Sequence, residues 1–210
     1  MTLLAPEQFA AFLAAAVLVT LSPGPDNLMV LSLGAARGRV QGMAFGLGCA
    51  MGCLSHTLLA AVGVSALIAA SPLAFTALKI AGGVYLVRLG WLALRSRGGT
   101  QLDTAATAPE TPWQLFWRGV VANAINPKVV MFFLAFLPQF VDTPRGDAPS
   151  QIVQLGVTFT LQAALIFGAL GWFAGQVGAW LKRHGQAGLW LDRVAGVIFV
   201  GLGLRLIVGG

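Results

Sequence analysis

The longest stretch without charge sets the strongest limit on how this chain can fold. Residues 40–78 contain no Asp, Glu, Lys or Arg. As one helix these 39 residues would extend about 58 Å, at 1.5 Å per residue. The hydrocarbon layer of a bilayer is only about 30 Å thick. The stretch therefore predicts two membrane helices, and Ser71-Pro72 is the expected turn because proline favours a helix start.

The composition agrees with a lipid environment. Apolar residues make up 57% of the chain and charged residues 10%, whereas a soluble domain has about 25% charged residues. This excludes an ordinary water-soluble globular protein. The net charge is +6, but the Lys and Arg residues are scattered between apolar stretches and form no basic face. No nucleic-acid partner is therefore expected.

Uncharged stretches of bilayer length recur along the whole chain. They predict an all-α membrane protein in which six transmembrane helices form a single transporter domain, residues 1–210. The expected spans are residues 6–36, 40–69, 72–94, 115–140, 150–180 and 189–208. The polar stretch 98–112 is rich in Thr, Ala and Pro, and it predicts a loop between two halves.

Basic residues predict the orientation in the membrane. The first, third and fifth loops hold Arg37, Arg39, Arg95, Arg97, Arg118, Lys182 and Arg183. The opposite side offers only Arg145 and Arg205. By the positive-inside rule the richer side is cytoplasmic. We therefore expect a multi-pass protein of the bacterial inner membrane with both termini in the periplasm.

Two of the expected spans contain a break. In the first span, Pro23, Gly24 and Pro25 remove backbone donors and helix-forming residues within three positions, next to Asp26 and Asn27. The fourth span is interrupted at Asn126-Pro127-Lys128. Asp26 lies 11 residues, or about 16 Å of helix, before Arg37, and Lys128 lies 10 residues, or about 15 Å, after Arg118. Both breaks are thus expected near the bilayer midplane.

The position of the breaks suggests an internal repeat. A repeated unit of three helices must be inserted upside down, so the first and fourth spans would be equivalent in a 3+3 inverted repeat. Paired interrupted helices indicate the binding site of a transporter. The alternative is that these prolines are kinks that serve only packing.

Asp26 and Lys128 favour a binding site over simple kinks. A charge at the middle of a bilayer costs at least about 2.5 kcal/mol, so neither residue is expected to face lipid. Opposite charges at one depth suit a ligand that carries both signs, such as an amino acid. Its carboxylate would meet Lys128 and its ammonium would meet Asp26. A permanent ion pair between the two residues is the structural alternative.

Two further titratable residues lie within expected spans. Lys79 could provide a second anion contact, or it could extend toward the nearer interface. His56 lies near the centre of the second span and titrates near neutral pH, which suits a proton relay. A buried histidine bonded to a neighbouring hydroxyl is the alternative for His56.

A soft-metal path is a weaker alternative. Cys49, Cys53 and His56 share one helical face by their spacing, which would suit an exporter of divalent or soft metal cations. The sequence offers no fourth ligand, and cysteine is often simply buried. We therefore predict no bound metal and no cofactor. No catalytic motif stands in its required context, so the chain is not expected to be an enzyme.

Four motifs together resemble the LysE/RhtB family of bacterial amino-acid exporters. SPGPDN at residues 22–27 is followed by glycines at 34, 38, 42 and 46. LKIAGGVYLVRLGWLALRS occupies residues 78–96, NPK occupies 126–128, and FLPQF occupies 136–140. The motifs span both halves of the chain.

The resemblance implies a small secondary exporter with six helices that is driven by the proton gradient. Carried over by position, the implied site residues are Pro23, Gly24, Pro25, Asp26, Asn27, Asn126, Pro127 and Lys128, with Lys79 at a basic position of the third helix. Asp26 after the PGP sequence resembles the threonine and homoserine branch of the family. The expected function is export of small neutral amino acids from cytoplasm to periplasm in exchange for protons. The sequence is compatible with a homo-oligomer but does not determine the oligomeric state.

Overall fold

The computed structural model describes residues 4–96, 110–184 and 186–208 and contains only helices in those ranges. Three helical spans are long and apolar enough to cross a bilayer, at Arg39–Leu67, Leu73–Leu94 and Ala148–Trp172. The number among the described residues rises to five if each of two bent helix pairs forms one span. The prediction of an all-α membrane protein is confirmed.

In the first half of the chain, the described residues 4–96 form five α-helices and one π-helical segment. They are α1 (Pro6–Leu21), α2 (Pro25–Arg37), α3 (Arg39–Leu59), the π-helix η1 (Ala60–Val64), α4 (Ser65–Ala70) and α5 (Pro72–Leu94). Proline stands at the start of α1, α2 and α5, where its missing N–H has no helical partner to lose. The Ser71 hydroxyl caps α5 by accepting a hydrogen bond from the Ala74 amide at 3.2 Å.

The second half begins after the 98–112 stretch, most of which lies outside the described residues. Its first elements are α6 (Pro112–Ala124), α7 (Pro127–Met131), the π-helix η2 (Phe132–Phe136) and two 3-10 helices, η3 (Leu137–Phe140) and η4 (Thr143–Arg145). They are followed by α8 (Ala148–Trp172), α9 (Ala174–Arg183) and α10 (Ala187–Val208).

The predicted span 150–180 covers two helices, because the helix is interrupted at Phe173. The 25 residues of α8 already extend about 37 Å, enough to cross the hydrocarbon layer. The 10-residue α9 is a separate helix. The predicted sixth span coincides with α10, which carries Asp192, Arg193 and Arg205 and is not among the spans that pass by length and composition. A sixth span and the inverted repeat stay predictions.

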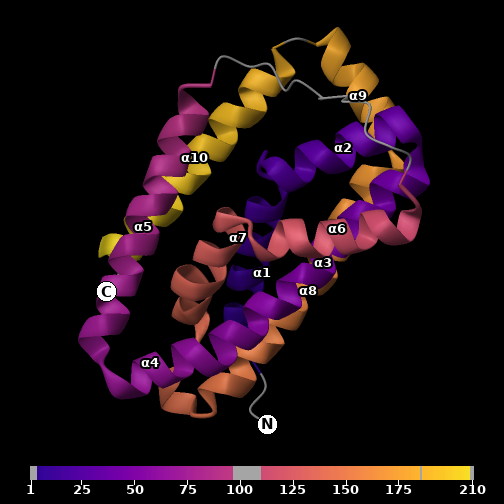
Figure 1. Cartoon of the computed structure of the whole chain (residues 1–210). Helices are drawn as coiled ribbons and strands as arrows, with labels where there is room; N and C mark the ends of the chain where they lie inside the picture. The colour runs from indigo at the N-terminus through magenta and orange to yellow at the C-terminus, as the bar shows by residue number, and fades with distance from the viewer. Residues whose placement is uncertain (1–3, 97–109, 185, 209–210) are drawn as a thin grey trace.

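Among the described residues, helices that are distant in the sequence pack against each other. In Figure 1, α5 and α10 run side by side, while α3 packs against both α6 and α8. Glycines allow the α5–α10 contact: a Cβ at Gly83 would lie 2.9 Å from the Gly203 carbonyl oxygen, and one at Gly196 would lie 2.8 Å from that of Gly90. The two helices are therefore antiparallel and in close backbone contact.

The glycines that follow the SPGPDN motif have two structural roles. Gly38 joins α2 to α3 with a φ of 104°, a conformation that favours glycine. A Cβ on Gly42 would lie 2.8 Å from the Cα of Gly34, so α2 and α3 pack closely beyond this turn.

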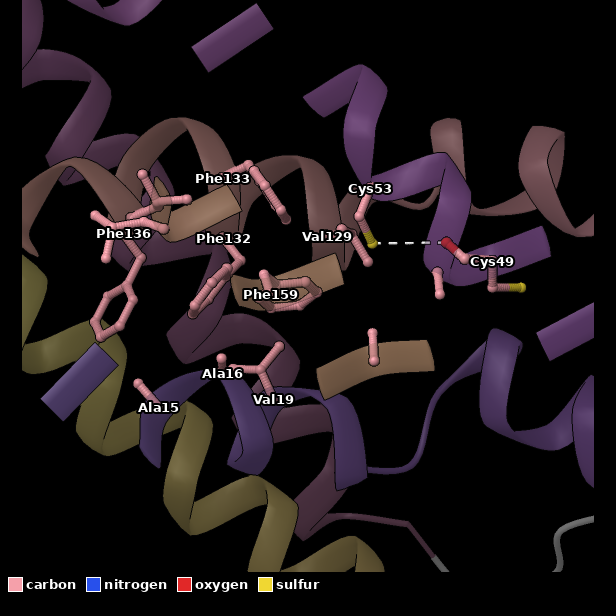
Figure 2. Packing of buried hydrophobic residues seen from close by; sticks show 14 of the residues in the cluster. Ala15, Ala16, Val19, Cys49, Cys53, Val129, Phe132, Phe133, Phe136 and Phe159 are labelled. Atoms are coloured by element: carbon pink, nitrogen blue, oxygen red, sulfur yellow. Dashed lines mark hydrogen bonds between the residues drawn. The ribbon is translucent and has the colours of Figure 1, made fainter. Parts of the chain in front are cut away.

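Aromatic side chains fill the space beside the second break. Figure 2 shows Phe132 and Phe133 of η2 near Phe159 of α8, with Val19 of α1 in the same region. The Phe159 ring centroid lies 5.1 Å from that of Phe132 and 4.9 Å from that of Phe133, within the range of favourable aromatic pairs. This cluster fixes η2 and α8 close to α1.

Candidate functional site

The first predicted break is present between α1 and α2, whose axes differ by 57°. Ser22 and Gly24 adopt extended backbone conformations, and α2 restarts at Pro25. Pro23 has no N–H to donate to the carbonyl four residues earlier, so the carbonyl of Val19 loses its helical partner. The break thus leaves backbone acceptors at the end of α1.

The second predicted break is also present, and α6 and the helix from Pro127 to Phe140 are bent by 50°. Asn126 is the N-cap of α7, and its Oδ1 accepts a hydrogen bond from the Lys128 amide at 3.0 Å. Pro127 removes the helical partner of the Asn123 carbonyl in the same way that Pro23 removes that of Val19.

Asp26 is buried at the N-terminal end of α2, with 3% of its surface exposed. Its Oδ2 accepts a hydrogen bond from Nδ2 of Asn123, on α6, at 2.8 Å. The N-terminus of a helix also stabilises a negative charge. A carboxylate can therefore remain inside this protein, and it is held against the second half of the chain.

Asn123 connects several predicted residues. Its backbone oxygen accepts a hydrogen bond from His56 Nε2 at 3.1 Å, and its Oδ1 lies 3.4 Å from the Cys53 thiol. The partner of His56 is thus a backbone carbonyl, where the alternative prediction placed a hydroxyl. His56 is joined to Asp26 through the single residue Asn123.

Lys128 is 7% exposed and reaches the end of α1. Its Nζ donates to the carbonyl oxygens of Ser22 at 3.0 Å and Val19 at 3.3 Å. A Cβ on Gly24 would lie 2.9 Å from this nitrogen, so the small residue makes room for the ammonium. A cation here stabilises the negative end of the α1 dipole.

Among the described residues no ion pair joins Asp26 to Lys128. Each charge instead meets polar groups beside the break in the other half: Asp26 meets Asn123, and Lys128 meets Ser22. The structure therefore brings both breaks together without neutralising their charges directly.

Three buried side chains near the breaks have a polar atom without a hydrogen-bond partner in the described structure. They are Oδ1 of Asn27, Nδ2 of Asn126 and Oε1 of Gln162. Two of the atoms are acceptors and one is a donor. An unpaired buried polar atom costs about 1–3 kcal/mol, so these three atoms are candidates for hydrogen bonds to a polar ligand.

Thr20 links two of these side chains. Its backbone oxygen accepts a hydrogen bond from Asn27 Nδ2 at 2.8 Å, and its hydroxyl accepts one from Gln162 Nε2, also at 2.8 Å. Helix α8 thereby reaches the first break through Gln162.

Lys79 is the predicted site residue for which the structure shows no such link. It is half-buried on α5, and its ammonium lies 5.6 Å from the centroid of the Phe75 ring on the same helix. Within the described residues, no group of three or more His, Cys, Asp and Glu side chains could hold a metal ion. Cys53 hydrogen bonds instead to the Cys49 carbonyl and Asn123, and Figure 2 shows the first of these contacts.

Sequence reasoning missed Asn123, Thr20 and Gln162. Asn123 and Gln162 are amides within uncharged helical stretches. Polar side chains in such stretches are buried between helices more often than they face lipid, and this signal could have identified both.

Polar contacts also join the helix ends on either side of the site. Glu110 forms ion pairs with Arg37 at 3.3 Å and Arg118 at 2.8 Å, which connects α2 to α6. At the other end, Gln8 of α1 donates hydrogen bonds to Gln151 of α8 and to the Phe140 carbonyl. These contacts link the two halves away from the breaks.

A family model described as LysE type translocator matches residues 17–210. The chain belongs to this family. The match includes both breaks and every residue of the site described above. It confirms the predicted resemblance, and it places the protein in a family of translocators.

Several relatives carry functional names. A homoserine/homoserine lactone efflux protein of Salmonella typhimurium is 33% identical and aligns over 95% of this chain and 96% of its own. A leucine efflux protein of Enterobacter sp. is 28% identical, over 94% of each chain. A threonine efflux protein of Escherichia coli is 28% identical, over 91% of this chain and 93% of its own. No solved structure matches this chain.

Proposed function

We propose that this protein exports small neutral amino acids across the bacterial inner membrane, from cytoplasm to periplasm, in exchange for protons. The observation that carries the proposal is the burial of Asp26 and Lys128, one beside each break, without an ion pair between them. Relatives named for efflux of homoserine, threonine and leucine support the substrate class.

The polar groups at the breaks match the two ends of an amino acid. The substrate ammonium would bind to the Asp26 carboxylate and to the free Oδ1 of Asn27. The substrate carboxylate would bind to the Lys128 ammonium and to the free Nδ2 of Asn126. Pro23, Gly24, Pro25 and Pro127 contribute by keeping the backbone open where these groups converge.

Proton exchange follows from the cost of an uncompensated charge inside a membrane. When the substrate leaves, Asp26 would lose the ammonium that offsets its charge, and a proton would replace it. One carboxylate that binds either an ammonium or a proton couples the two movements in opposite directions. His56 is a candidate for proton transfer because it and Asp26 both hydrogen bond to Asn123.

Alternating access would use the two bends. Substrate binding would draw Lys128 away from the Ser22 and Val19 carbonyls and so weaken a contact between the halves. The halves could then rock about the site and open one end at a time. The ion pairs of Glu110 with Arg37 and Arg118 would break when one end opens, and the hydrogen bond between Gln8 and Gln151 would break when the other end opens.

The test uses purified protein reconstituted in proteoliposomes. We expect an imposed pH gradient to drive transport of labelled threonine or homoserine by the wild type, and we expect Asp26→Asn to abolish this response. Ligand binding is measured separately by melting the protein in detergent with a panel of amino acids. A ligand at 100 times its Kd stabilises the folded state by about 2.7 kcal/mol.

Asp147→Asn is the matched control, because Asp147 is exposed and its side chain caps no helix amide. This variant should transport like the wild type. If Asp26→Asn folds and transports at the wild-type rate, Asp26 has no part in the mechanism. If no amino acid is transported or raises the melting temperature, the proposed function is wrong.

A further inference from the structure

Gln162 is a buried amide on α8 and belongs to neither break. Only 7% of its surface is exposed. Its Nε2 donates two hydrogen bonds, to the Thr20 hydroxyl at 2.8 Å and to the Phe159 carbonyl at 3.0 Å. Both hydrogens of the amide nitrogen are therefore used.

These two bonds fix the direction of the amide. The Phe159 carbonyl can only accept a hydrogen bond, so the nitrogen of Gln162 and not its oxygen must face it. Oε1 is left without a donor although it is buried. Such an atom is an acceptor that is already positioned, and burying it empty costs free energy.

Thr20 places this acceptor at the proposed substrate site. The backbone oxygen of Thr20 binds Asn27, which follows Asp26 directly, and its hydroxyl holds Gln162. Asp26 supplies the negative charge that an ammonium requires. An uncharged amide oxygen on a third element suits an uncharged donor, and the simplest such donor on an amino acid is a side-chain hydroxyl.

On the basis of the proposed function, we propose that Gln162 determines specificity by accepting a hydrogen bond from a hydroxyl group on the side chain of the substrate. The protein then prefers threonine to valine, which has the same shape but carries a methyl group in place of the hydroxyl. A site built to bind a hydroxyl rejects the analogue that lacks it, because the acceptor in the protein stays unpaired.

The experiment compares initial transport rates of labelled threonine and valine in proteoliposomes. We expect the wild type to favour threonine in kcat/KM. Gln162→Met has a similar volume and no acceptor, and it should reduce the ratio of threonine to valine by about tenfold or more. Valine transport should persist in this variant.

Two further variants separate specificity from folding. Thr20→Val keeps the shape and the backbone carbonyl of residue 20 but removes one of the two acceptors that hold Gln162, so the ratio should fall by a smaller factor. Gln154→Met is the control: Gln154 is on the same helix and bonds to the Ser150 carbonyl, and its replacement should leave the ratio unchanged.

The outcomes distinguish this inference from the proposed function. A wild type that transports threonine and valine equally well overturns the role of Gln162 while export of amino acids stands. The same holds if Gln162→Met or Thr20→Val reduces both substrates to the same extent. A wild type that transports no amino acid overturns the proposed function and this inference with it.

Discussion

At both breaks a proline interrupts the hydrogen bonding of the helix, but the charged residues beside the two breaks have opposite signs. At each break a proline removes the donor for the carbonyl four residues earlier, and a nearby group replaces it: the Ser22 hydroxyl donates to the Val19 carbonyl at 2.6 Å and the Asn126 amide to the Asn123 carbonyl at 2.9 Å. Each carbonyl also accepts a second hydrogen bond from the other half of the chain, from Lys128 at Val19 and from His56 at Asn123. The first break contributes a carboxylate beyond its proline and the second contributes an ammonium.

This difference shows why a pair of broken helices can be more than a pair of kinks. Two kinks that served only packing would require no charge inside the membrane. Here each charged residue follows its own break and contacts the polar group that precedes the other: Asp26 contacts Asn123, and Lys128 contacts Ser22. A ligand with both charges can therefore compete with both contacts.

The largest effect is expected at the charge of the second break. Lys128→Met should reduce amino-acid transport about a hundredfold or more, because truncating one partner of a buried charged contact is costly and the substrate carboxylate loses its cation. Counterflow in proteoliposomes measures the rate, and a melting curve in detergent reports folding. Arg145→Met, in an exposed segment, is the control.

The same pair of measurements separates the two roles of Lys128. A variant that melts at a lower temperature but transports normally would show that Lys128 only caps α1. The charge at the second break would then serve only to cap a helix and would have no role in transport.

An intermediate effect is expected from loss of the hydrogen bond that Asn123, in the second half, donates to Asp26, in the first half. Asn123→Ala removes the donor to Asp26 and should lower the free energy of unfolding by about 1–3 kcal/mol, with slower transport. Cys53→Ala is the control, since it removes a weak thiol donor shared by the same Asn123 side chain and the Cys49 carbonyl, and leaves the bond from Asn123 to Asp26 in place. Melting curves of equal midpoint for the two variants would contradict the importance of the Asp26 contact.

The smallest effect on transport is expected from a change in the contact between α3 and α6, the helix on which Asn123 lies. A Cβ on Gly48 would lie 1.9 Å from the Phe116 carbonyl oxygen, so Gly48→Ala must separate α3 from α6. Overpacking of this kind costs about 1–3 kcal/mol of stability. Gly168→Ala, in α8 with no atom within 4 Å of the new Cβ, should instead stabilise the helix by about 0.5–1 kcal/mol.

Chemical denaturation in detergent would rank these two glycine variants. Should Gly48→Ala be as stable as Gly168→Ala, the close α3–α6 contact would not be what positions Asn123 against the first break.

Much of the helical framework could be predicted from the sequence alone. The breaks at Pro23 and Pro127 are present because a missing N–H is a covalent property of proline and acts in any context. The start of a helix at Pro72 likewise depends on local chemistry. The assignment to the class of membrane proteins depends on the length of the apolar stretches. The exception is Phe173, where an uncharged stretch gave no signal that α8 ends and α9 begins.

The tertiary structure alone decided which groups meet. Asp26 and Asn123 are 97 residues apart, Lys128 and Ser22 are 106 apart, and Gln162 and Thr20 are 142 apart. The sequence indicated buried charges at one depth but allowed either an ion pair or a shared ligand. Proline determines that a carbonyl is freed, and a neighbour such as the Ser22 hydroxyl can bind it locally. Only the packing of distant helices determines which side chain of the other half also reaches it, because that choice depends on the position of every helix between them.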